Sequence, residues 1–482
     1  MTERAHLAVV GAGPAGLAAA LAAADRGVRV TLVDAAEQAG GQFYRQPARA
    51  LGARRPEALH HQWRIWERLR DGADRHITAG RITHLTDHHV WCVERESAHD
   101  QPPSNRDQHS SQSFTSFTVY ALCGPAQEEG VAVRADAVLL APGGYERVLP
   151  FPGWTLPGVV TAGGAQAMLK GGLVLPGRTV VVAGTGPLLL PVATGLAAAG
   201  ARVAALVESA DPRALLRRTH TLAAEPGKLA EGAWYAGQLL RRGVRTLGRH
   251  IVVEAHGADR LTAVTVAALG KDRRIRPGSA RRIPCDTLAV GHGMLPHTDL
   301  AETLGCTLSG TDGTAVRVDD EQRTDVPGVW AAGETTGIGG AALALAEGHI
   351  AGRSIAARLY GTAPDPRSWA AAARTRTRLR AFFAALDAVY APPAGWADRL
   401  TDDTVVCRCE EVTAGAVRTA AGSLGAGDLR TVKLLTRAGM GWCQGRMCAP
   451  AVAGLTGCPL TAGRRPFARP VPLGVLAGLP ED

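Results

Sequence analysis

The sequence is poor in lysine, aromatic residues and cysteine, and each shortage excludes a class of protein. Only four of its 53 basic residues are lysines, and aromatic residues make up 5% of its 482 positions. The arginines that give the net charge of +9 are scattered, and no nucleic-acid-binding module is visible. Nine cysteines are too few for a disulfide scaffold. We therefore expect no nucleic-acid partner, and we interpret the basic surface as solvated or as a dock for an acidic protein.

Uninterrupted hydrophobic runs are also scarce. Residues 179–201 carry no charged side chain, which would suit a membrane span, and residues 7–24 have the composition of a signal peptide. Both stretches, however, place a glycine-rich turn directly after a valine-rich run. A strand, a tight turn and an alanine-rich helix explain this order better. We therefore expect a cytoplasmic protein without a transmembrane segment.

What the chain does contain is a repeated strand–turn–helix–strand pattern. An apolar run ends at Gly11, an alanine-rich run continues to Ala24, and the apolar run 28–33 is closed by Asp34. The same order returns after Arg178, with a second acid at Glu208. Apolar runs of this length are typical of buried parallel strands. The pattern predicts an α/β protein with two Rossmann-like nucleotide-binding domains.

The first turn has the chemistry of a diphosphate site. Three glycines in the order G-x-G-x-x-G permit a tight turn, let the backbone approach a diphosphate, and let the helix pack on the strand. The helix N-terminus then presents free N–H groups to the anion. A carboxylate at the end of the next strand can bind an adenosine ribose. The candidate residues are Gly11, Gly13, Pro14, Ala15, Gly16 and Asp34.

Three further segments favour FAD over NAD at this site. Residues 321–340 resemble the second FAD motif of flavoproteins similar to thioredoxin reductase and glutathione reductase, in which a strand ends in Gly-Asp. There the acid binds the ribityl chain, and the following helix stabilises negative charge on the reduced flavin; Glu334 stands in place of that Asp. Residues 139–144 resemble the family's Ala-Thr-Gly strand end, and residues 40–42 resemble the loop along the flavin. These segments add Gly41, Gln42, Ala141, Gly143, Gly333 and Glu334 to the candidate site.

The second turn keeps two glycines and loses the third. Gly184 and Gly186 are followed by Leu189, which would hold the helix farther from the strand. Glu208 could bind a ribose and would repel a 2′-phosphate, so NAD or another adenine nucleotide is favoured over NADP. An empty, degenerate nucleotide fold is the alternative.

Four cysteines near the C-terminus predict a metal centre, formed by Cys407, Cys409, Cys443 and Cys448. Four thiolates can hold a [2Fe-2S] cluster or one zinc ion, and spacing alone does not separate the two. C-x-C followed by C-x₄-C differs from the usual zinc pairs, and the flanking residues resemble the bacterioferritin-associated-ferredoxin-like [2Fe-2S] domain. Arg408 and Arg446 would offset the negative charge of a cluster. The remaining cysteines are interpreted as small buried hydrophobes: Cys92, Cys123, Cys285, Cys306 and Cys458.

These signals divide the chain into parts. We expect a discontinuous FAD-binding domain at 1–177 and 290–360, into which an NAD(P)- or adenine-nucleotide-binding-like domain, 178–289, is inserted. A proline-flanked helical connector at 361–400 leads to the cluster domain at 401–457 and to a tail at 458–482 with little periodicity. Residues 95–118 are rich in Ser, Gln, Asp and Pro and are expected to form a flexible surface insertion.

The order of these parts resembles one group of oxidoreductases. It comprises the α-type subunits of opine oxidase, D-hydroxyproline dehydrogenase, dye-linked L-proline dehydrogenase and bacterial hydrogen cyanide synthase, to which residues 179–191 and 470–473 are also similar. The resemblance implies a heteromeric complex in which a second flavoprotein subunit, similar to amino-acid oxidases, removes a hydride from an amino or imino acid. The α-type chain then relays the electrons, through its FAD or cluster, to a quinone or another carrier.

An NAD(P)H-dependent FAD and iron–sulfur reductase is the main alternative, with Gly184, Gly186 and Glu208 holding the dinucleotide. Thioredoxin reductase itself is disfavoured, because the chain has no C-x-x-C pair to pass electrons to a disulfide. No group of residues suggests an amine-binding site, so the catalytic residues stay unassigned. His292 and His297 are interpreted as structural residues near the return to the FAD domain.

Overall fold

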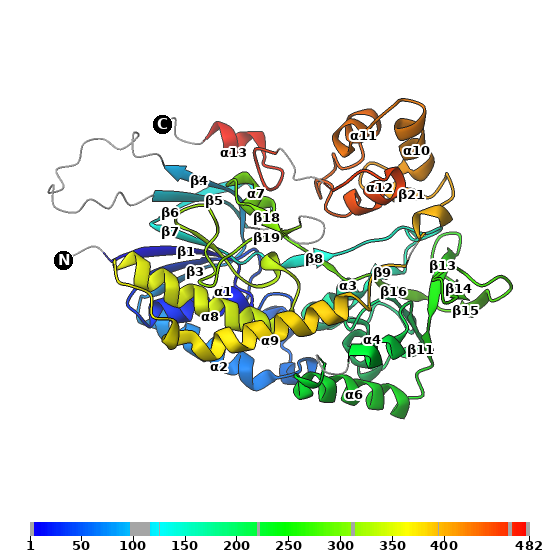
Figure 1. Ribbon diagram of the computed structural model, residues 1–482, viewed down its shortest axis with the longest axis horizontal. Coiled ribbons are helices and arrows are strands. Elements are labelled where there is room, and N and C mark those ends of the chain that lie inside the picture. The colour runs from blue at the N-terminus through cyan, green and yellow to red at the C-terminus, as the bar shows by residue number, and fades with distance from the viewer. Residues whose placement is uncertain are drawn as a thin grey trace.

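The computed structural model describes residues 4–96, 116–124, 126–218, 222–309, 314–393, 395–460 and 465–478. Two five-stranded sheets and a smaller helical domain organise these residues (Figure 1). The arrangement confirms the predicted α/β class, with one Rossmann-like fold inserted into another and a small domain near the C-terminus.

The first sheet is parallel throughout, and its strands come from distant parts of the chain. Its strand order is β20-β7-β1-β2-β3. Strand β20 therefore pairs with β7, although the strands of the second sheet lie between the two in sequence. The central strand β1 is almost fully buried, as its continuous aliphatic run requires. The bounds are β1 His6–Val10, β2 Arg29–Val33, β3 Ile82–Leu85, β7 Ala137–Leu140 and β20 Val329–Ala331.

Two long helices, α1 (Pro14–Ala24) and α8 (Gly340–Leu359), pack on this sheet and on each other. A Cβ atom on Gly348 would lie 2.1 Å from the carbonyl oxygen of Ala15, and one on Gly352 would lie 2.3 Å from that of Ala19. Small residues are therefore a packing requirement here, because the helix backbones nearly touch. Helix α2 (Trp63–Thr78) packs against α1.

An antiparallel sheet, β4-β5-β6, packs against β1 and β7. Its strands are β4 His88–Glu96, β5 Ser116–Cys123 and β6 Glu129–Ala135. The expected insertion at 95–118 is wrong at both ends, because Arg95 pairs with Phe117 and Glu96 pairs with Ser116 in the ladder. Residues 97–115, the centre of that insertion, lie outside the described residues.

The second sheet is also parallel, in the order β12-β11-β10-β16-β9. Its strands are β9 Val159–Thr161, β10 Thr179–Gly184, β11 Arg202–Glu208, β12 Thr246–Gly248 and β16 Thr287–Gly291. Its helices are α3 Ala162–Gly172, α4 Leu189–Ala198 and α6 Pro226–Arg241. The uncharged run 179–201 is thus a strand, a turn and a helix. Within the described ranges no helix is long and apolar enough to cross a membrane.

Smaller elements connect the two sheets. Strands β8 (Gly144–Glu146) and β17 (Met294–Pro296) pair as an antiparallel ribbon that leads from the first sheet to the second and back, followed by helix α7 (Asp299–Thr303). A three-stranded antiparallel sheet packs on the second sheet and contains β13 His250–His256, β14 Ala263–Ala268 and β15 Arg281–Pro284. Strands β18 (Leu308–Ser309) and β19 (Ala315–Val316) form a short hairpin.

Helix α9 (Ala370–Asp387) lies along α8 and reaches both folds (Figure 1). Its Arg380 pairs with Glu347 of α8 at 2.6 Å, and its Arg378 pairs with Glu225 beside α6 at 2.7 Å. The helical character expected for this connector is thus present, and the helix ties the two folds together.

The small domain has its own apolar core and is built from β21 Val405–Cys407, β22 Val412–Thr413, α10 Ala414–Gly422, α11 Leu429–Thr436 and α12 Ala449–Thr456. The tail after it returns to the β4-β5-β6 sheet, where Phe467 packs edge-on against Trp91 with ring centroids 4.9 Å apart. The tail also contains helix α13 (Leu473–Ala477). Apart from this helix, the described part of the tail has no regular secondary structure, and its few apolar residues cover the sheet.

Candidate cofactor sites

The first glycine turn is so tight that only glycine fits at two of its positions. Gly11 has a φ of +101°, and a Cβ atom there would lie 2.3 Å from the carbonyl oxygen of Ala141. A Cβ atom on Gly16 would lie 1.8 Å from the carbonyl oxygen of Gly11. The structure therefore brings Gly11, Gly16 and Ala141 together where β1, α1 and β7 meet.

The N-terminus of α1 offers free backbone donors beside this turn. Gly13 caps the helix without a side chain, Pro14 has no N–H, and the N–H groups of the next two residues have no partner within the helix. Such polarised N–H groups stabilise a diphosphate. Gly41 lies against the turn with a φ of +59°, and a Cβ atom there would come 2.8 Å from Cα of Gly13. The side chain of Gln42 is exposed and accepts a hydrogen bond from Nη2 of Arg45 at 2.6 Å.

Asp34 directly follows β2 and lies next to the same turn. Its carboxylate accepts hydrogen bonds from the N–H of Ala12 and, at 2.8 Å, from the N–H of Ala36. Burial raises the pKa of this carboxyl group. The backbone bonds fix the carboxylate beside the diphosphate position, and its remaining lone pairs suit the hydroxyl groups of a ribose.

The segment after β20 forms the other half of the site. Gly333 has a φ of +80°, and a Cβ atom there would lie 2.8 Å from Cβ of Ala15 on α1. The carboxylate of Glu334 accepts hydrogen bonds from the N–H groups of Gly339 at 3.0 Å and Gly340 at 2.7 Å. It therefore caps α8, and burial raises its pKa. The carboxylate of Glu334 therefore lies at the N-terminus of α8, which is the helix end that a flavin ring would face.

A buried network holds this segment in place, and no local pattern in the sequence indicates it. Glu347 of α8, 1% exposed, accepts hydrogen bonds from the N–H of Gly333 at 2.9 Å and from the guanidinium of Arg380. Arg380 also donates to the hydroxyl of Thr336 at 2.7 Å and to the carbonyl oxygen of Gly337 at 2.8 Å. Helix α9 thus fixes the loop that carries Gly333 and Glu334.

The second glycine turn has a different hydrogen-bond pattern from the first. Gly184 again approaches a neighbouring strand closely, since a Cβ atom there would lie 1.7 Å from the carbonyl oxygen of Gly291. Asp34 accepts a hydrogen bond from the residue after the first glycine of its turn, whereas Glu208 accepts one from the second glycine, Gly186, at 3.0 Å. Glu208 also accepts a hydrogen bond from the N–H of Ala210 at 2.8 Å. Burial raises the pKa of Glu208 to about 7. The N–H of Gly186, which stands at the position of Gly13 in the first turn, is therefore already bonded to the carboxyl group of Glu208.

The segment after α9 lies on this second turn. The hydroxyl of Thr185 donates to the carbonyl oxygen of Tyr390 at 3.5 Å, and Arg273 donates to the carbonyl oxygen of Pro392 at 3.0 Å. Burial raises the pKa of Tyr390 to about 12. A dinucleotide at Gly184 and Gly186 would have to share this space with the connector.

The four predicted ligand cysteines form two close pairs. Sγ of Cys409 lies 3.9 Å from Sγ of Cys443, and the thiol of Cys448 donates to the sulfur of Cys407, which lowers the Cys407 pKa to about 5. A Cβ atom on Gly441 would lie 2.2 Å from Cβ of Cys409, so the loop needs glycine there. The described residues contain no group of three such side chains around a single metal ion. Two thiol pairs fit a dinuclear cluster, in which each iron takes two cysteines.

The other cysteines only partly follow the expectation of buried hydrophobes. Cys92, Cys285 and Cys306 are buried, and burial raises the pKa of each thiol. Cys123 and Cys458 are partly exposed, so the expectation is wrong for these two. Cys123 is the last residue of β5, and Cys458 follows α12 by two residues.

One carboxylate joins the cluster loop to the first fold. Asp299 of α7 pairs with Arg446 at 2.9 Å, with Arg465 at 3.0 Å and with His297 at 3.1 Å. Burial alone would raise the pKa of Asp299, but the close contact with His297 and the charge of Arg446 outweigh it and hold the pKa well below its usual range. The N–H of His297 in turn donates to the carbonyl oxygen of Gly143 at 3.1 Å. A continuous chain of contacts therefore runs from Gly143 to the loop between Cys443 and Cys448.

Comparison with known proteins agrees with this geometry. The family model for pyridine nucleotide-disulphide oxidoreductases matches residues 5–354, and that for the BFD-like [2Fe-2S] binding domain matches residues 405–455. The chain is 34% identical to the HcnB subunit of hydrogen cyanide synthase from Pseudomonas protegens, over 91% of this chain and 89% of that one. It is 33% identical to a subunit of opine oxidase from Agrobacterium tumefaciens, over 92% of this chain and 84% of that one.

A solved structure shares the fold. L-proline dehydrogenase from P. horikoshii superposes with a TM-score of 0.63 at 20% identity, covering 99% of this chain and 81% of that one. The matches confirm the resemblance drawn from the sequence. They show a flavin-dependent oxidoreductase that uses FAD and a [2Fe-2S] cluster. The chain therefore belongs to the pyridine nucleotide-disulphide oxidoreductase family and carries a BFD-like [2Fe-2S] domain.

Proposed function

We propose that this chain is the electron-relaying subunit of a heteromeric dehydrogenase for amino or imino acids of the opine, hydroxyproline, proline or glycine-like kind. A second flavoprotein subunit, similar to amino-acid oxidases, oxidises the substrate in this proposal. Support comes from the similar chains, which are named as subunits of hydrogen cyanide synthase and opine oxidase. The role of this chain is then to receive electrons and pass them on.

The observation that carries the proposal is the link through Asp299. FAD exchanges electrons in pairs or singly, whereas a [2Fe-2S] cluster takes one at a time, so the two together suit a relay. Gly11, Gly13 and Asp34 would hold the diphosphate and ribose ends, and Gly333 and Glu334 would face the flavin. Asp299 holds the cluster loop on the fold that contains these residues. A relay needs this fixed approach of two redox sites.

The second candidate function is an NAD(P)H-dependent reductase, and the second glycine turn favours it. Three features oppose it. The carboxylate of Glu208 occupies the N–H of Gly186, and the connector at Tyr390 lies against Thr185. Helix α9 also forms ion pairs with both folds, through Arg378 with Glu225 and through Arg380 with Glu347. A rotation of one fold against the other would break these ion pairs. We therefore place the reductase second.

Two measurements test the proposal. The first adds NADH or NADPH to the purified holoprotein under anaerobic conditions and follows the visible absorbance of the flavin. The relay predicts no reduction within seconds, whereas rapid bleaching would favour the reductase. The second purifies the tagged chain from its host; the relay predicts that a second flavoprotein co-purifies and that the complex reduces an artificial acceptor with an amino or imino acid. A chain that purifies alone and is reduced by NADH would refute the proposal.

A further inference from the structure

Two adjoining cavities lie where the β8/β17 region, the second fold and the small domain meet. One has a volume of ≈ 50 Å³ and the other of ≈ 20 Å³, and both are walled by Leu149, Phe151 and His292. A cavity needs about 10–15 Å³ of volume open to the centre of a water-sized sphere to hold one water molecule. The pair therefore has room for several waters or for one small solute.

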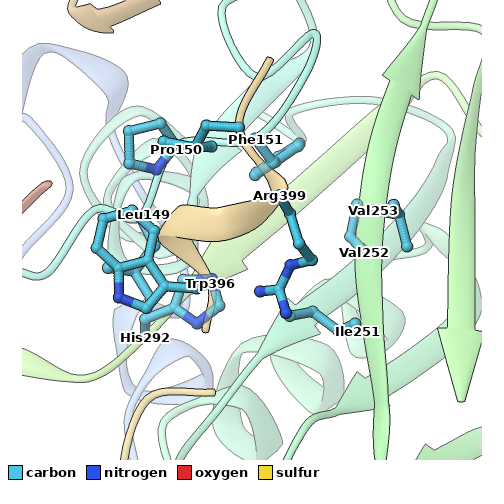
Figure 2. Close-up of a pocket in the computed structure, with 10 residues that line it drawn as sticks. Leu149, Pro150, Phe151, Ile251, Val252, Val253, His292, Trp396 and Arg399 are labelled. Carbon is cyan, nitrogen blue, oxygen red and sulfur yellow. The ribbon is translucent and has the colours of Figure 1, made fainter. Parts of the chain in front are cut away.

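His292 is a buried polar group without a partner in this space. Its side chain is 7% exposed, and Nδ1 makes no hydrogen bond to any described residue. Burial, together with the charges of Arg399 and Arg147, lowers the pKa of His292 to about 4, so the ring is neutral near neutral pH. Figure 2 shows the guanidinium of Arg399 directed toward His292 and Trp396. A buried ring nitrogen without a hydrogen-bond partner is energetically unfavourable, and a bound acceptor would satisfy it.

The charge around the cavities is positive. Arg399 lines the smaller cavity, Arg147 and Arg408 line the larger one, and the described lining residues include no Asp or Glu. Asp387 lies near Arg147, and Asp398 is exposed beside Arg399. Burial lowers the pKa of Arg399, and no hydrogen bond or ion pair joins its guanidinium to a described residue. A half-buried guanidinium without a hydrogen-bond or ion-pair partner favours the binding of an anion next to it.

The geometry points to a binding site for a small carboxylate in these cavities, held by the guanidinium of Arg399 and the ring of His292. A carboxylate is planar and presents two oxygens, which match the donors of a guanidinium. Its carbon end can then face the walls formed by Leu149, Phe151 and Val252. Apart from Arg399, His292 and Trp396, the smaller cavity is lined by apolar side chains, so it favours an anion with one charged end and one apolar end over phosphate.

The site lies next to the cluster loop. Arg408 stands between Cys407 and Cys409, lines the larger cavity, and lies over the ring of Trp154 at 6.0 Å. A bound carboxylate adds negative charge near the cluster and so lowers its reduction potential. The carboxylate concentration would thus set how readily the cluster accepts an electron. This inference rests on the cluster and does not depend on the identity of the electron donor.

The test titrates the holoprotein with sodium acetate in a calorimeter at constant chloride. We expect one saturable site per chain, and at least tenfold weaker binding in Arg399→Gln. Arg399→Lys keeps the charge without the planar fork and should fall between the two. Arg367→Gln, which changes an exposed arginine, is the matched control and should bind acetate as the wild type does. His292→Phe keeps a ring of similar size and should also weaken binding, which covers the case that Arg399→Gln fails to fold.

Two further measurements separate a built site from surface attraction. Benzoate has the same head group but exceeds the cavity, so it should not compete with acetate. Acetate should lower the midpoint potential of the cluster in the wild type and in Arg367→Gln, with no shift in Arg399→Gln. Wild-type protein that shows no saturable binding, equal affinity in Arg399→Gln, or equal competition by phosphate would each overturn the inference.

Discussion

Replacing Asp299 with asparagine removes one negative charge and keeps the size of the side chain. In the wild type this carboxylate pairs with two guanidinium groups, those of Arg446 and Arg465, and with His297. The pairs are largely shielded from water, since the side chains of Asp299, Arg446 and Arg465 are 14%, 18% and 28% exposed. A neutral amide at this position would leave both guanidinium groups without an ionised partner at a domain junction. We expect the small domain to stay folded but to dock less firmly.

The size of the effect follows from the burial. Removing one partner of a buried ion pair costs about 3–5 kcal/mol. At about 1.4 kcal/mol for each factor of ten, the undocked population should rise roughly a hundredfold to several thousandfold. The pKa of Asp299 is depressed in the folded state, so its contribution is present in full above the ordinary value near 4 and is lost only as the pH falls toward the folded value. The effect of the substitution should therefore be the same at about pH 6 and about pH 8.

Hydrogen exchange of the holoprotein measures the docking directly. We expect faster exchange in residues 443–448 and 465–478 of Asp299→Asn, while β1 and α1 keep their protection. Electron transfer from photoreduced flavin to the cluster should slow at least tenfold, with the iron and FAD contents unchanged. The matched control is Asp402→Asn, which removes a carboxylate on the small domain that is 79% exposed and pairs with Arg418. Such a surface pair contributes about 0–1 kcal/mol.

The reasoning would be refuted by an Asp299→Asn protein whose exchange and electron-transfer rates match those of Asp402→Asn. Equal rates would mean that Asp299 neither holds the cluster loop nor sets its distance from the flavin. Loss of iron in Asp299→Asn would instead assign Asp299 to the folding of the loop itself.

Three other substitutions give distinct outcomes. Gly16→Ala places a Cβ atom 1.8 Å from the carbonyl oxygen of Gly11, so it should cost roughly 1–3 kcal/mol and release FAD while iron stays bound, as measured by cofactor content. Cys443→Ser should abolish iron and keep FAD; simultaneous loss of the flavin would contradict separate sites. Burial raises the pKa of Glu208 to about 7, so the wild type should lose up to roughly 3 kcal/mol of stability between about pH 4.5 and pH 7, because this carboxyl group ionises in the unfolded chain while it stays protonated in the folded one. Glu208→Gln should remove that loss in denaturant unfolding, and an unchanged pH dependence would contradict the buried charge.

The glycine turns were predictable because their signals are local. A valine-rich run, a glycine spacing and an acid at the end of the next run are all contained in residues 6–34 and again in residues 179–208. The cysteine loop was predictable for the same reason. The exact geometry of the turns was not predictable in this way, because it depends on close approaches between strands, such as that of Gly11 to Ala141, which only the folded sheet shows.

The contacts that join these local units were not predictable. Asp299 and Arg446 are far apart in sequence, and nothing around Asp299 distinguishes it from a surface acid. Glu347 is likewise an ordinary helix residue until Arg380 arrives from the next helix. A sequence pattern reports the period of one element, whereas these pairs depend on how separate elements are placed. The carboxylate of Glu334 is a further example, because its hydrogen bonds to the first N–H groups of α8 appear only in the folded structure.

The tail has a consequence for how electrons can travel. The chain is held on both sides of the small domain, before it by the hydrogen bonds of Tyr390 and Pro392 to the second fold and after it by the return of residues 465–478 to the β4-β5-β6 sheet. A domain attached in this way cannot swing out on a flexible linker to visit distant acceptors. The [2Fe-2S] cluster would therefore keep a fixed position, and an external electron acceptor has to bind at the surface of this protein to receive electrons from it.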